Sequence, residues 1–290
     1  MPRPNRPRRS VLYVPATSAD ALAKVGARGA DTVIVDLEDS VAPDRKAAAR
    51  EAVAAFFADT PPKSVEWVIR VNAPSTEWGA EDLALAGRLA PDAILLPKVE
   101  TPRDLLEVND VLDEADVPNE VGLWAMIETP RALLNIGAIA ELGRDRGARL
   151  ACLVVGTNDL VKETGVAAER RLLAPWLMQV VLGARASGLT AMDGVYNDFR
   201  DVDGFARDCL ESAAMGFDGR TLIHPSQVEP ANRAYAPSPA ALDEARRIVA
   251  TFALPENAGR GAISLDGRMV ERLHLDMAER LIARAGGQSK

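Results

Sequence analysis

Short runs of apolar and β-branched residues alternate with longer amphipathic stretches through most of the 290-residue chain. Runs of four to eight such residues bounded by turn residues are typical of buried strands, whereas apolar positions three and four apart are typical of helices. The strands predicted in this way cover residues 10–15, 32–38, 66–72, 92–99, 121–128, 150–156, 190–195 and 221–224. The helices predicted among them cover residues 43–58, 81–90, 101–115, 130–142, 169–186 and 201–215.

Eight repeats of strand and helix predict an α/β fold of the (β/α)₈ or TIM-barrel type. The alternative is an open doubly wound sheet, which typically carries a glycine-rich GxGxxG turn after its first strand. Here that turn reads VPATS at residues 14–18, so the barrel is favoured. We expect residues 1–235 to form the barrel and residues 236–290 a helical extension that acts as a lid or an oligomer arm. Its predicted helices cover residues 239–252 and 269–285, with a loop at 255–261.

Composition excludes several function classes. Lysine and arginine total 34 against 42 aspartates and glutamates, a formal net charge of −8, which is unlike the basic surface of a nucleic-acid binder. No apolar run is long enough to span a membrane, and no export signal is visible, so we expect a cytoplasmic protein without a membrane partner. Cys152 and Cys209 show no CxxC spacing, which favours a reducing compartment. With two histidines in the chain, a bound metal is expected to be a hard cation held by carboxylates.

Polar side chains gather where the predicted strands end. In order along the chain they are Asp36, Glu38, Arg70, Asn72, Lys98, Glu128, Asn158, Asp159, Asp193 and His224. Taken singly, each fits a structural role, such as a helix N-cap for Asp159, a solvated charge for Lys98 or a core histidine for His224. In a barrel, however, the carboxyl ends of all strands meet at one rim, where active sites lie. Their convergence on that rim therefore favours an active site.

Seven motifs in this order resemble the citrate lyase beta-subunit family, which also contains malyl-CoA and citramalyl-CoA lyases and belongs to the HpcH/HpaI aldolase/citrate lyase superfamily. They are RRSVLYVP at residues 8–15, DLEDSVAP at 36–43, IRVN at 69–72, LPKVE at 96–100, MIET at 126–129, GTNDL at 156–160 and IHPSQ at 223–227. The resemblance implies a TIM barrel that assembles as a trimer or hexamer, with a C-terminal segment covering a neighbouring subunit's site. It also implies magnesium-dependent cleavage or formation of a carbon–carbon bond between a thioester enolate and a 2-oxo acid.

Carried over position by position, the resemblance implies roles for individual residues. The implied Mg²⁺ ligands are Glu128 and Asp159, the implied substrate-binding residues are Arg70, Glu128, Asn158, Ile223 and His224, and the implied CoA contacts are Arg8 and Arg9. Because CoA is anionic and the chain is acidic, a local basic patch is needed, and Lys98 is a third candidate for it. A fixed guanidinium such as Arg70 is also suited to stabilise an enolate oxygen, so we assign it a catalytic role.

Two positions depart from the family pattern. Many family lyases have Gly-x-Glu-Asp where this chain has GTND at residues 156–159, which is closer to metal-dependent 2-oxo-acid aldolases that act on free acids. The family commonly has Met-Ile-Asp near its C-terminus, with the aspartate reaching the neighbouring subunit as acid or base. Here the motif is MVE at residues 269–271, so Glu271 is either that catalytic group or an acid that stabilises a helix start.

The function predicted first is a CoA-ester lyase that converts a malyl-, citramalyl- or citryl-type β-hydroxyacyl-CoA to acetyl-CoA and a 2-oxo acid. The alternatives are an aldolase of a free hydroxy-oxo acid, a citrate lyase beta subunit that requires partner chains, a thioesterase using the same metal site, and a binding subunit without activity.

Overall fold

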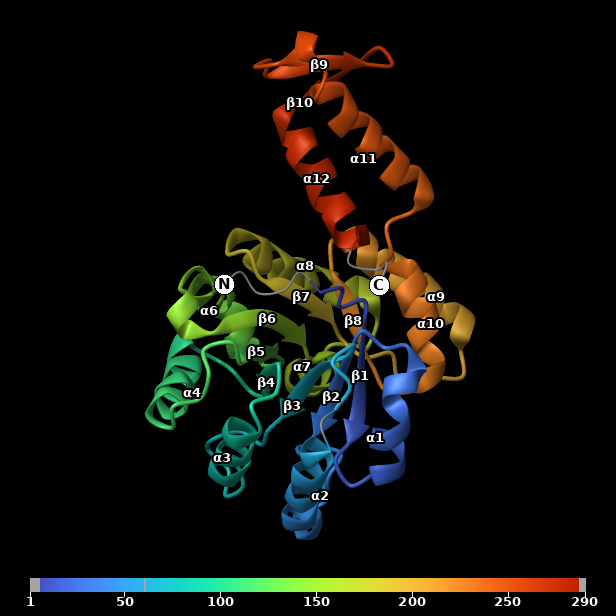
Figure 1. Ribbon diagram of the computed structural model, residues 1–290. Coiled ribbons are helices and arrows are strands. Elements are labelled where there is room, and N and C mark those ends of the chain that lie inside the picture. Colours follow the sequence, from blue (N-terminus) through green and yellow to red (C-terminus); the bar gives the residue numbers. More distant parts are fainter. Residues whose placement is uncertain (1–5, 60, 287–290) are drawn as a thin grey trace. The chain divides into compact units, whose positions relative to one another are not determined.

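The computed structural model describes residues 6–59 and 61–286, and these residues include a closed barrel of eight parallel strands (Figure 1). Each strand pairs with its sequence neighbours, and the first strand closes the barrel against the eighth. The strands are β1 (Ser10–Pro15), β2 (Thr32–Asp36), β3 (Glu66–Arg70), β4 (Ala93–Leu96), β5 (Gly122–Ile127), β6 (Leu150–Val155), β7 (Thr190–Asp193) and β8 (Gly219–Leu222). The predicted (β/α)₈ barrel is confirmed, and each strand overlaps its predicted range.

Helices follow the strands in the order that the alternating pattern predicts. They are α1 (Ala19–Val25), α2 (Lys46–Ala58), α3 (Gly79–Leu89), α4 (Pro102–Glu114), α5 (Pro130–Leu134), α6 (Ile136–Glu141), α7 (Thr157–Thr164), α8 (Arg170–Ala186), α9 (Val202–Met215) and α10 (Val228–Ala234). The predicted helix at 130–142 is broken where Asn135 leaves helical dihedrals and donates its side-chain amide to the Glu100 carbonyl at 2.9 Å. In addition, α1, α7 and α10 lie where no helix is predicted. Within residues 6–59 and 61–286, none of the helices combines the length and apolar composition that a membrane crossing needs.

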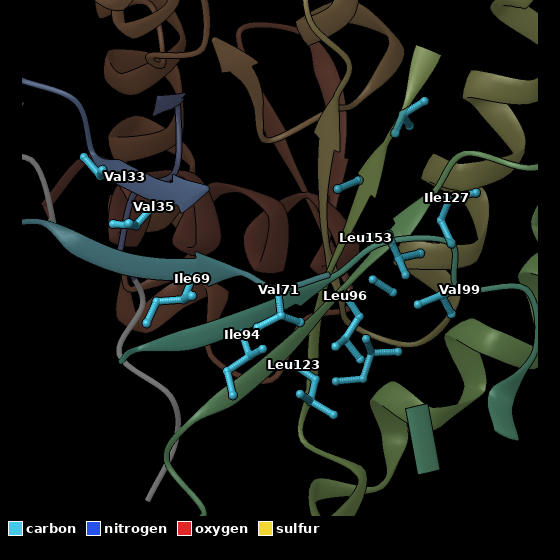
Figure 2. Close-up of a cluster of buried hydrophobic side chains, with 14 of the residues drawn as sticks. Val33, Val35, Ile69, Val71, Ile94, Leu96, Val99, Leu123, Ile127 and Leu153 are labelled. Atoms are coloured by element: carbon cyan, nitrogen blue, oxygen red, sulfur yellow. The ribbon is translucent and has the colours of Figure 1, made fainter. Parts of the chain in front are cut away.

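Side chains along each strand alternate between two cores, because successive strand residues point to opposite faces. One core fills the barrel and includes Ile34 and Trp124. The other lies between the strands and the surrounding helices and includes Val33 and Val35 (Figure 2). Burial of one such aliphatic side chain contributes about 1.5–3 kcal/mol, so the register of each strand is strongly fixed. Asp36 shares the face of Ile34 and therefore points into the barrel at its carboxyl end.

The chain divides into two compact units, the barrel unit Arg8–Tyr235 and a second unit that contains residues 236–286. The second unit consists of α11 (Pro239–Phe252), β9 (Ala262–Leu265), β10 (Arg268–Glu271) and α12 (Arg272–Gly286). Its two helices pack against each other, and Phe252, Ile263 and Val270 form a small core.

The two strands of the second unit form an antiparallel hairpin, which follows the predicted loop at 255–261 and includes residues 269–271, the predicted start of the last helix. The turn residues Asp266 and Gly267 both have positive φ, 53° and 76°. An Asp-Gly pair is a strong signal for such a two-residue turn, because glycine and aspartate tolerate this conformation better than other residues. The last helix consequently starts at Arg272, three residues later than predicted.

Candidate active site

A cavity of about 400 Å³ opens at the carboxyl ends of the barrel strands, the end at which TIM barrels place their active sites. Loops after several different strands contribute to its wall. Among the residues that line it are five of the predicted site residues, Arg70, Glu128, Asn158, Asp159 and Ile223. The structure therefore brings together side chains that are far apart in the sequence, from Arg70 to Ile223.

Arg70, the last residue of β3, is held by two acidic side chains from the end of β2. Its Nε and Nη2 donate to the two carboxylate oxygens of Asp36 at 2.7 Å each, and its Nη1 lies 2.8 Å from Glu38 Oε2. Its guanidinium also lies over the Tyr13 ring, 4.8 Å from the centroid. Burial would raise the pKa of Asp36, but the hydrogen bonds and charge of Arg70 outweigh this effect and lower it. Asp36 is thus the ionised partner of Arg70.

The Arg70 guanidinium keeps donors for a ligand. The group has five N–H bonds. Two of them donate to Asp36 and one donates to the Met126 sulfur at 3.8 Å. Glu38 Oε2 lies 2.8 Å from Nη1 but accepts no hydrogen bond, so the remaining N–H bonds of this cavity-lining side chain can reach a ligand.

Glu38 differs from Asp36 in its protonation. Burial raises the pKa of Glu38 to about 8, and although Arg70 opposes this shift, the nearby carboxylates Asp39 and Glu128 add to it. Glu38 therefore carries its proton at neutral pH. One positive charge on Arg70 is then matched by one negative charge on Asp36.

The loop that follows β2 is fixed from behind by Lys46. The Lys46 ammonium donates to the carbonyls of Leu37 and Glu38 and to Asn72 Oδ1 at 2.7–2.8 Å. Asn72 also donates to the Leu37 carbonyl at 2.9 Å. Asn72 consequently supports the loop and does not face the cavity, unlike the rim position predicted for it.

Glu128 directly follows β5 and Asp159 lies in α7, after the neighbouring strand β6, and both contact the cation of Lys98. The Lys98 backbone N–H donates to Glu128 Oε1 at 2.8 Å, while its Nζ donates to Asp159 Oδ1 at 2.6 Å and lies 3.7 Å from Glu128 Oε1. Gly156 is required beside them, because a Cβ at this position would collide with the Glu128 side chain. Burial raises the pKa of Glu128, and the attraction of Lys98 offsets this only in part. Lys98 therefore lies with these two carboxylates, and its contact with CoA stays a prediction.

The donor set of Glu128 and Asp159 fits a magnesium ion. The Lys98 ammonium already places positive charge beside both carboxylates. Across residues 6–59 and 61–286, no group of three or more His, Cys, Asp and Glu side chains is arranged to hold a metal. Mg²⁺ is typically bound by one or two carboxylates and fills its remaining positions with water and substrate oxygens. Glu128 and Asp159 would therefore hold the ion, and the substrate would complete its coordination.

Two asparagine side chains join the wall of the cavity. Asn197 Nδ2 donates to Asn158 Oδ1 at 2.8 Å, and Asn158 Nδ2 donates back to Asn197 Oδ1 at 3.3 Å. This exchange links α7 to the loop after β7. Asn158 thus lies where the sequence places it, beside Asp159, while Asn197 is an addition.

His224 lies next to the lining residue Ile223, but its side chain forms a hydrogen bond that caps the following helical turn. Its Nδ1 accepts the backbone N–H of Ser226 at 3.2 Å and so caps the short helical turn that follows. Its ring stacks on Phe199 with centroids 4.6 Å apart, and the Arg200 guanidinium lies 5.8 Å from the same Phe199 ring. These three side chains, of which Phe199 and Arg200 are exposed and His224 is half-buried, form a group that we call the rim shelf.

Arg8 and Arg9 lie at the opposite end of the barrel. Arg8 donates to both carboxylate oxygens of Glu66 at 2.6–2.7 Å and to the Thr190 hydroxyl at 2.8 Å. Arg9 pairs with Asp31 at 2.7–2.8 Å. Because both arginines precede β1, they meet the amino ends of the parallel strands rather than the carboxyl ends. This position corrects the expectation that they contact CoA beside the cavity.

Asp193 is also turned away from the cavity, although it ends β7. It is fully buried and lies 2.9 Å from Arg170 Nη2 and 3.8 Å from Arg220 Nη1. Arg220 Nε in turn donates to the Gly194 carbonyl at 2.7 Å. These charges hold the start of the loop that carries Asn197.

Glu271 lies in the second unit, at the end of β10 and directly before α12. Its backbone N–H donates to His274 Nδ1 at 3.0 Å. The position fits an acid at the start of a helix, and the reach of Glu271 into a neighbouring subunit stays a prediction.

Tyr13 and Asn197 also line the cavity, although neither is predicted as a site residue from the sequence. Strand alternation could have found Tyr13, which shares the inward face of Val11 and packs against the core that fills the barrel. No such signal exists for Asn197, because it lies in an irregular loop.

Comparison with known proteins agrees with this geometry. The sequence pattern of the HpcH/HpaI aldolase/citrate lyase family matches residues 9–225. A (3S)-malyl-CoA thioesterase of Cereibacter sphaeroides is 42% identical over 281 residues, which cover 96% of this chain and 95% of the relative. Citrate lyase subunit beta of Escherichia coli is 32% identical over 290 residues, covering 98% and 95%.

A solved structure is similar over nearly the whole chain. It is the CitE protein of Mycobacterium tuberculosis in complex with magnesium, acetoacetate and coenzyme A, with a TM-score of 0.77 and 33% identity over 98% of this chain and 99% of that one. Because the family pattern covers most of the chain and the relatives match it almost from end to end, this protein belongs to the HpcH/HpaI aldolase/citrate lyase family.

Proposed function

We propose that this protein uses magnesium to cleave or form the carbon–carbon bond of a β-hydroxyacyl-CoA of the malyl, citramalyl or citryl type. The observation that carries the proposal is one cavity shared by the Asp36-held Arg70 and the carboxylates Glu128 and Asp159. Arg70 offers a fixed donor for a thioester oxygen. The two carboxylates offer oxygen ligands for a cation that also binds the 2-oxo acid.

Cleavage places negative charge where Arg70 can stabilise it. The hydroxyl proton leaves to a base, the hydroxyl carbon becomes the carbonyl of the oxo acid, and the electron pair of the broken bond forms a thioester enolate. The enolate then takes a proton at carbon and becomes acetyl-CoA. Because Asp36 and Glu38 already fix the Arg70 guanidinium, its free N–H needs little reorganisation as charge develops on the enolate oxygen.

The carboxylates supply the other half of the site. A magnesium ion held by Glu128 and Asp159 would polarise the oxo-acid oxygen and bind its carboxylate. Gly156 and the Lys98 backbone N–H fix Glu128 in place before any ligand binds.

The rim shelf of Phe199, Arg200 and His224 is the proposed contact for CoA. It neighbours Asn197 and Ile223, which line the cavity. Stacked aromatic and imidazole rings offer a face to adenine, and a guanidinium pairs with phosphate. The shelf therefore replaces Arg8 and Arg9 in the proposal.

The second unit is proposed to cover the cavity of a neighbouring copy in a trimer or hexamer. In support, Met269, Leu273 and Met277 expose 71%, 54% and 63% of their surface, and such apolar groupings often mark contact surfaces. Glu271 lies in the same segment and is the proposed acid or base. Glu271→Gln should then lower kcat by about 10²–10⁴-fold, with Mg²⁺ affinity unchanged in calorimetry. An unchanged kcat would leave Glu271 as an acid at a helix start.

Thioester hydrolysis is the second candidate, favoured by the 42% identity to a protein named (3S)-malyl-CoA thioesterase. In this reaction water attacks the thioester carbonyl, the carbon–sulfur bond breaks, and malate and CoA leave. Arg70 would stabilise the oxyanion in the same position.

Product analysis tests both candidates. The purified protein is incubated with malyl-CoA, citramalyl-CoA and citryl-CoA in parallel, with magnesium and with a chelator. Magnesium-dependent acetyl-CoA together with glyoxylate, pyruvate or oxaloacetate supports the lyase and identifies its acyl group. Free CoA with the intact hydroxy acid supports hydrolysis. The absence of both reactions would contradict the proposal and favour a free-acid aldolase or a subunit that requires partner chains.

A further inference from the structure

Lys98 contacts both proposed magnesium ligands through two different atoms. It follows β4 with a φ of +52°, a conformation that residues other than glycine and asparagine seldom adopt. From there its backbone N–H reaches Glu128 and its ammonium reaches Asp159. Unusual backbone conformations persist where the surroundings hold them, and they concentrate at functional sites.

The charges around Lys98 balance only in particular combinations. Glu128 and Asp159 carry two negative charges and Lys98 one positive charge, so the group has a net charge of −1. A divalent cation changes the net charge to +1, and the carboxylate of a 2-oxo acid then brings it to zero. Without Lys98, the cation alone would neutralise both carboxylates, and no net positive charge would remain to attract the carboxylate of the acid.

The contacts also put the ammonium in competition with a metal. The Lys98 ammonium donates a hydrogen bond to Asp159 Oδ1 at 2.6 Å, and a metal ion would bind the same oxygen. The Lys98 side chain is 36% exposed, so the ammonium has solvent to move into, whereas Glu128 is 2% exposed. Burial opposes the charge of Lys98, but its bond to Asp159 and the charge of Glu128 raise its pKa, and the cation persists at neutral pH.

We propose that Lys98 is a built-in counter-cation that makes magnesium binding depend on an anionic 2-oxo acid. In the absence of the acid, the ammonium competes with the metal for Asp159. When the acid is present, its carboxylate neutralises the extra positive charge, and metal and acid bind together. This inference rests on the proposed function, because it takes the acid and the metal from that proposal.

Calorimetric titration of Mg²⁺ into the wild-type protein and Lys98→Met, with and without saturating pyruvate, tests the proposal. In the wild type, pyruvate should raise Mg²⁺ affinity by about tenfold or more, a typical coupling between two sites. In Lys98→Met, whose unbranched side chain is one atom shorter and carries no charge, Mg²⁺ alone should bind more tightly than in the wild type. Pyruvate should then add less than about threefold. If Lys98→Met binds Mg²⁺ alone no more tightly, or keeps the full effect of pyruvate, the proposal is overturned.

Two further variants separate charge from structure. Lys162→Met removes the same charge from α7, the helix that carries Asp159, and should behave as the wild type because Lys162 is exposed and outside the cavity. Lys98→Arg keeps the charge and should keep most of the coupling. Loss of coupling in Lys162→Met would assign the effect to general electrostatics and overturn the specific role of Lys98.

The outcome is separable from that of product analysis. Coupling that depends on Lys98 in a protein that cleaves no thioester supports this inference and contradicts the proposed reaction. Thioester cleavage by a protein whose coupling survives Lys98→Met does the reverse. If Mg²⁺ does not bind the wild type even with pyruvate, the inference fails.

Discussion

Each end of the barrel holds an arginine paired with a buried carboxylate, Arg70 with Asp36 at the carboxyl ends of the strands and Arg8 with Glu66 at the amino ends. At the amino end both side chains of the pair form further hydrogen bonds within the protein. Glu66 also accepts a hydrogen bond from the Thr32 hydroxyl, and Arg8 also donates to Thr190. Gly219 is so close to the Arg8 carbonyl that a Cβ would collide with it. At the carboxyl end, Arg70 lines a cavity and has a donor to spare.

The difference shows that a buried ion pair does not by itself indicate a site. Both pairs are bidentate and both arginines lie against an aromatic ring. Strand direction separates them, because loops that follow parallel strands build a pocket and residues that precede them close the other end. We therefore expect substitutions at the two ends to affect different measurements.

The largest effect is expected for Glu128→Gln. Loss of the proposed magnesium ligand should remove several kcal/mol of transition-state stabilisation, so kcat/KM should fall by about 10³-fold or more. The matched control is Glu66→Gln, which removes a similarly buried carboxylate from the amino end. Steady-state kinetics on the folded fraction should show near-native kcat for Glu66→Gln, and a comparable fall in both variants would contradict the assignment of the two ends.

Arg8→Met should act on stability instead of on turnover. It leaves Glu66 buried without its cation, and breaking such a pair typically costs about 3–5 kcal/mol. Urea denaturation should report this loss, while kcat at a temperature where the variant is folded stays near that of the wild type. A fall in kcat with stability unchanged would place Arg8 at the active site after all.

Arg200→Ala should have a moderate effect on binding. Loss of the proposed phosphate contact should raise the KM for a CoA thioester by about fivefold at low salt and less at high salt. Arg9→Ala, at the amino end, should change neither KM nor its salt dependence. The reverse pattern would return the CoA contact to Arg9 and remove it from the rim shelf.

The smallest effect is expected for Glu38→Gln, in the pH dependence of stability. The folded protein holds the Glu38 proton up to about pH 8, whereas the unfolded chain loses it near the ordinary value of 4.5. The stabilisation linked to this proton is complete below pH 4.5 and is lost as the pH rises through 8. The wild type should therefore lose unfolding free energy between about pH 4.5 and pH 8, and Glu38→Gln should lose less. Equal slopes in metal-free urea denaturation would show that Glu38 is ionised throughout this range.

The barrel and much of its site could be predicted because both depend on short-range patterns. Alternation along β2 places Ile34 and Asp36 on the inward face, and the ends of β3 and β5 place Arg70 and Glu128 on one rim. The orientation of Arg8 was equally available from the sequence, since it precedes the first strand.

Other features depend on contacts between distant segments and carry no local signal. The left-handed backbone of Lys98 follows from its contacts with Glu128 and Asp159, which lie 30 and 61 positions away. Asp193 ends a strand as the other rim residues do, yet it is buried because Arg170 and Arg220 meet it from elsewhere in the chain. The sequence thus predicts which charged residues end the strands more readily than it predicts the residues with which they pair.

Gly156 limits how this scaffold can evolve. Any side chain there would occupy the space of the Glu128 carboxyl group, whereas Asn158 and Asn197 contact each other in the wall of the same cavity. Random mutagenesis and selection for a larger or smaller acyl group should accordingly recover changes at 158 and 197. Position 156 should stay glycine in every active clone, since the proposed metal ligand Glu128 depends on it, while the proposed contacts to the acyl group begin only two positions away.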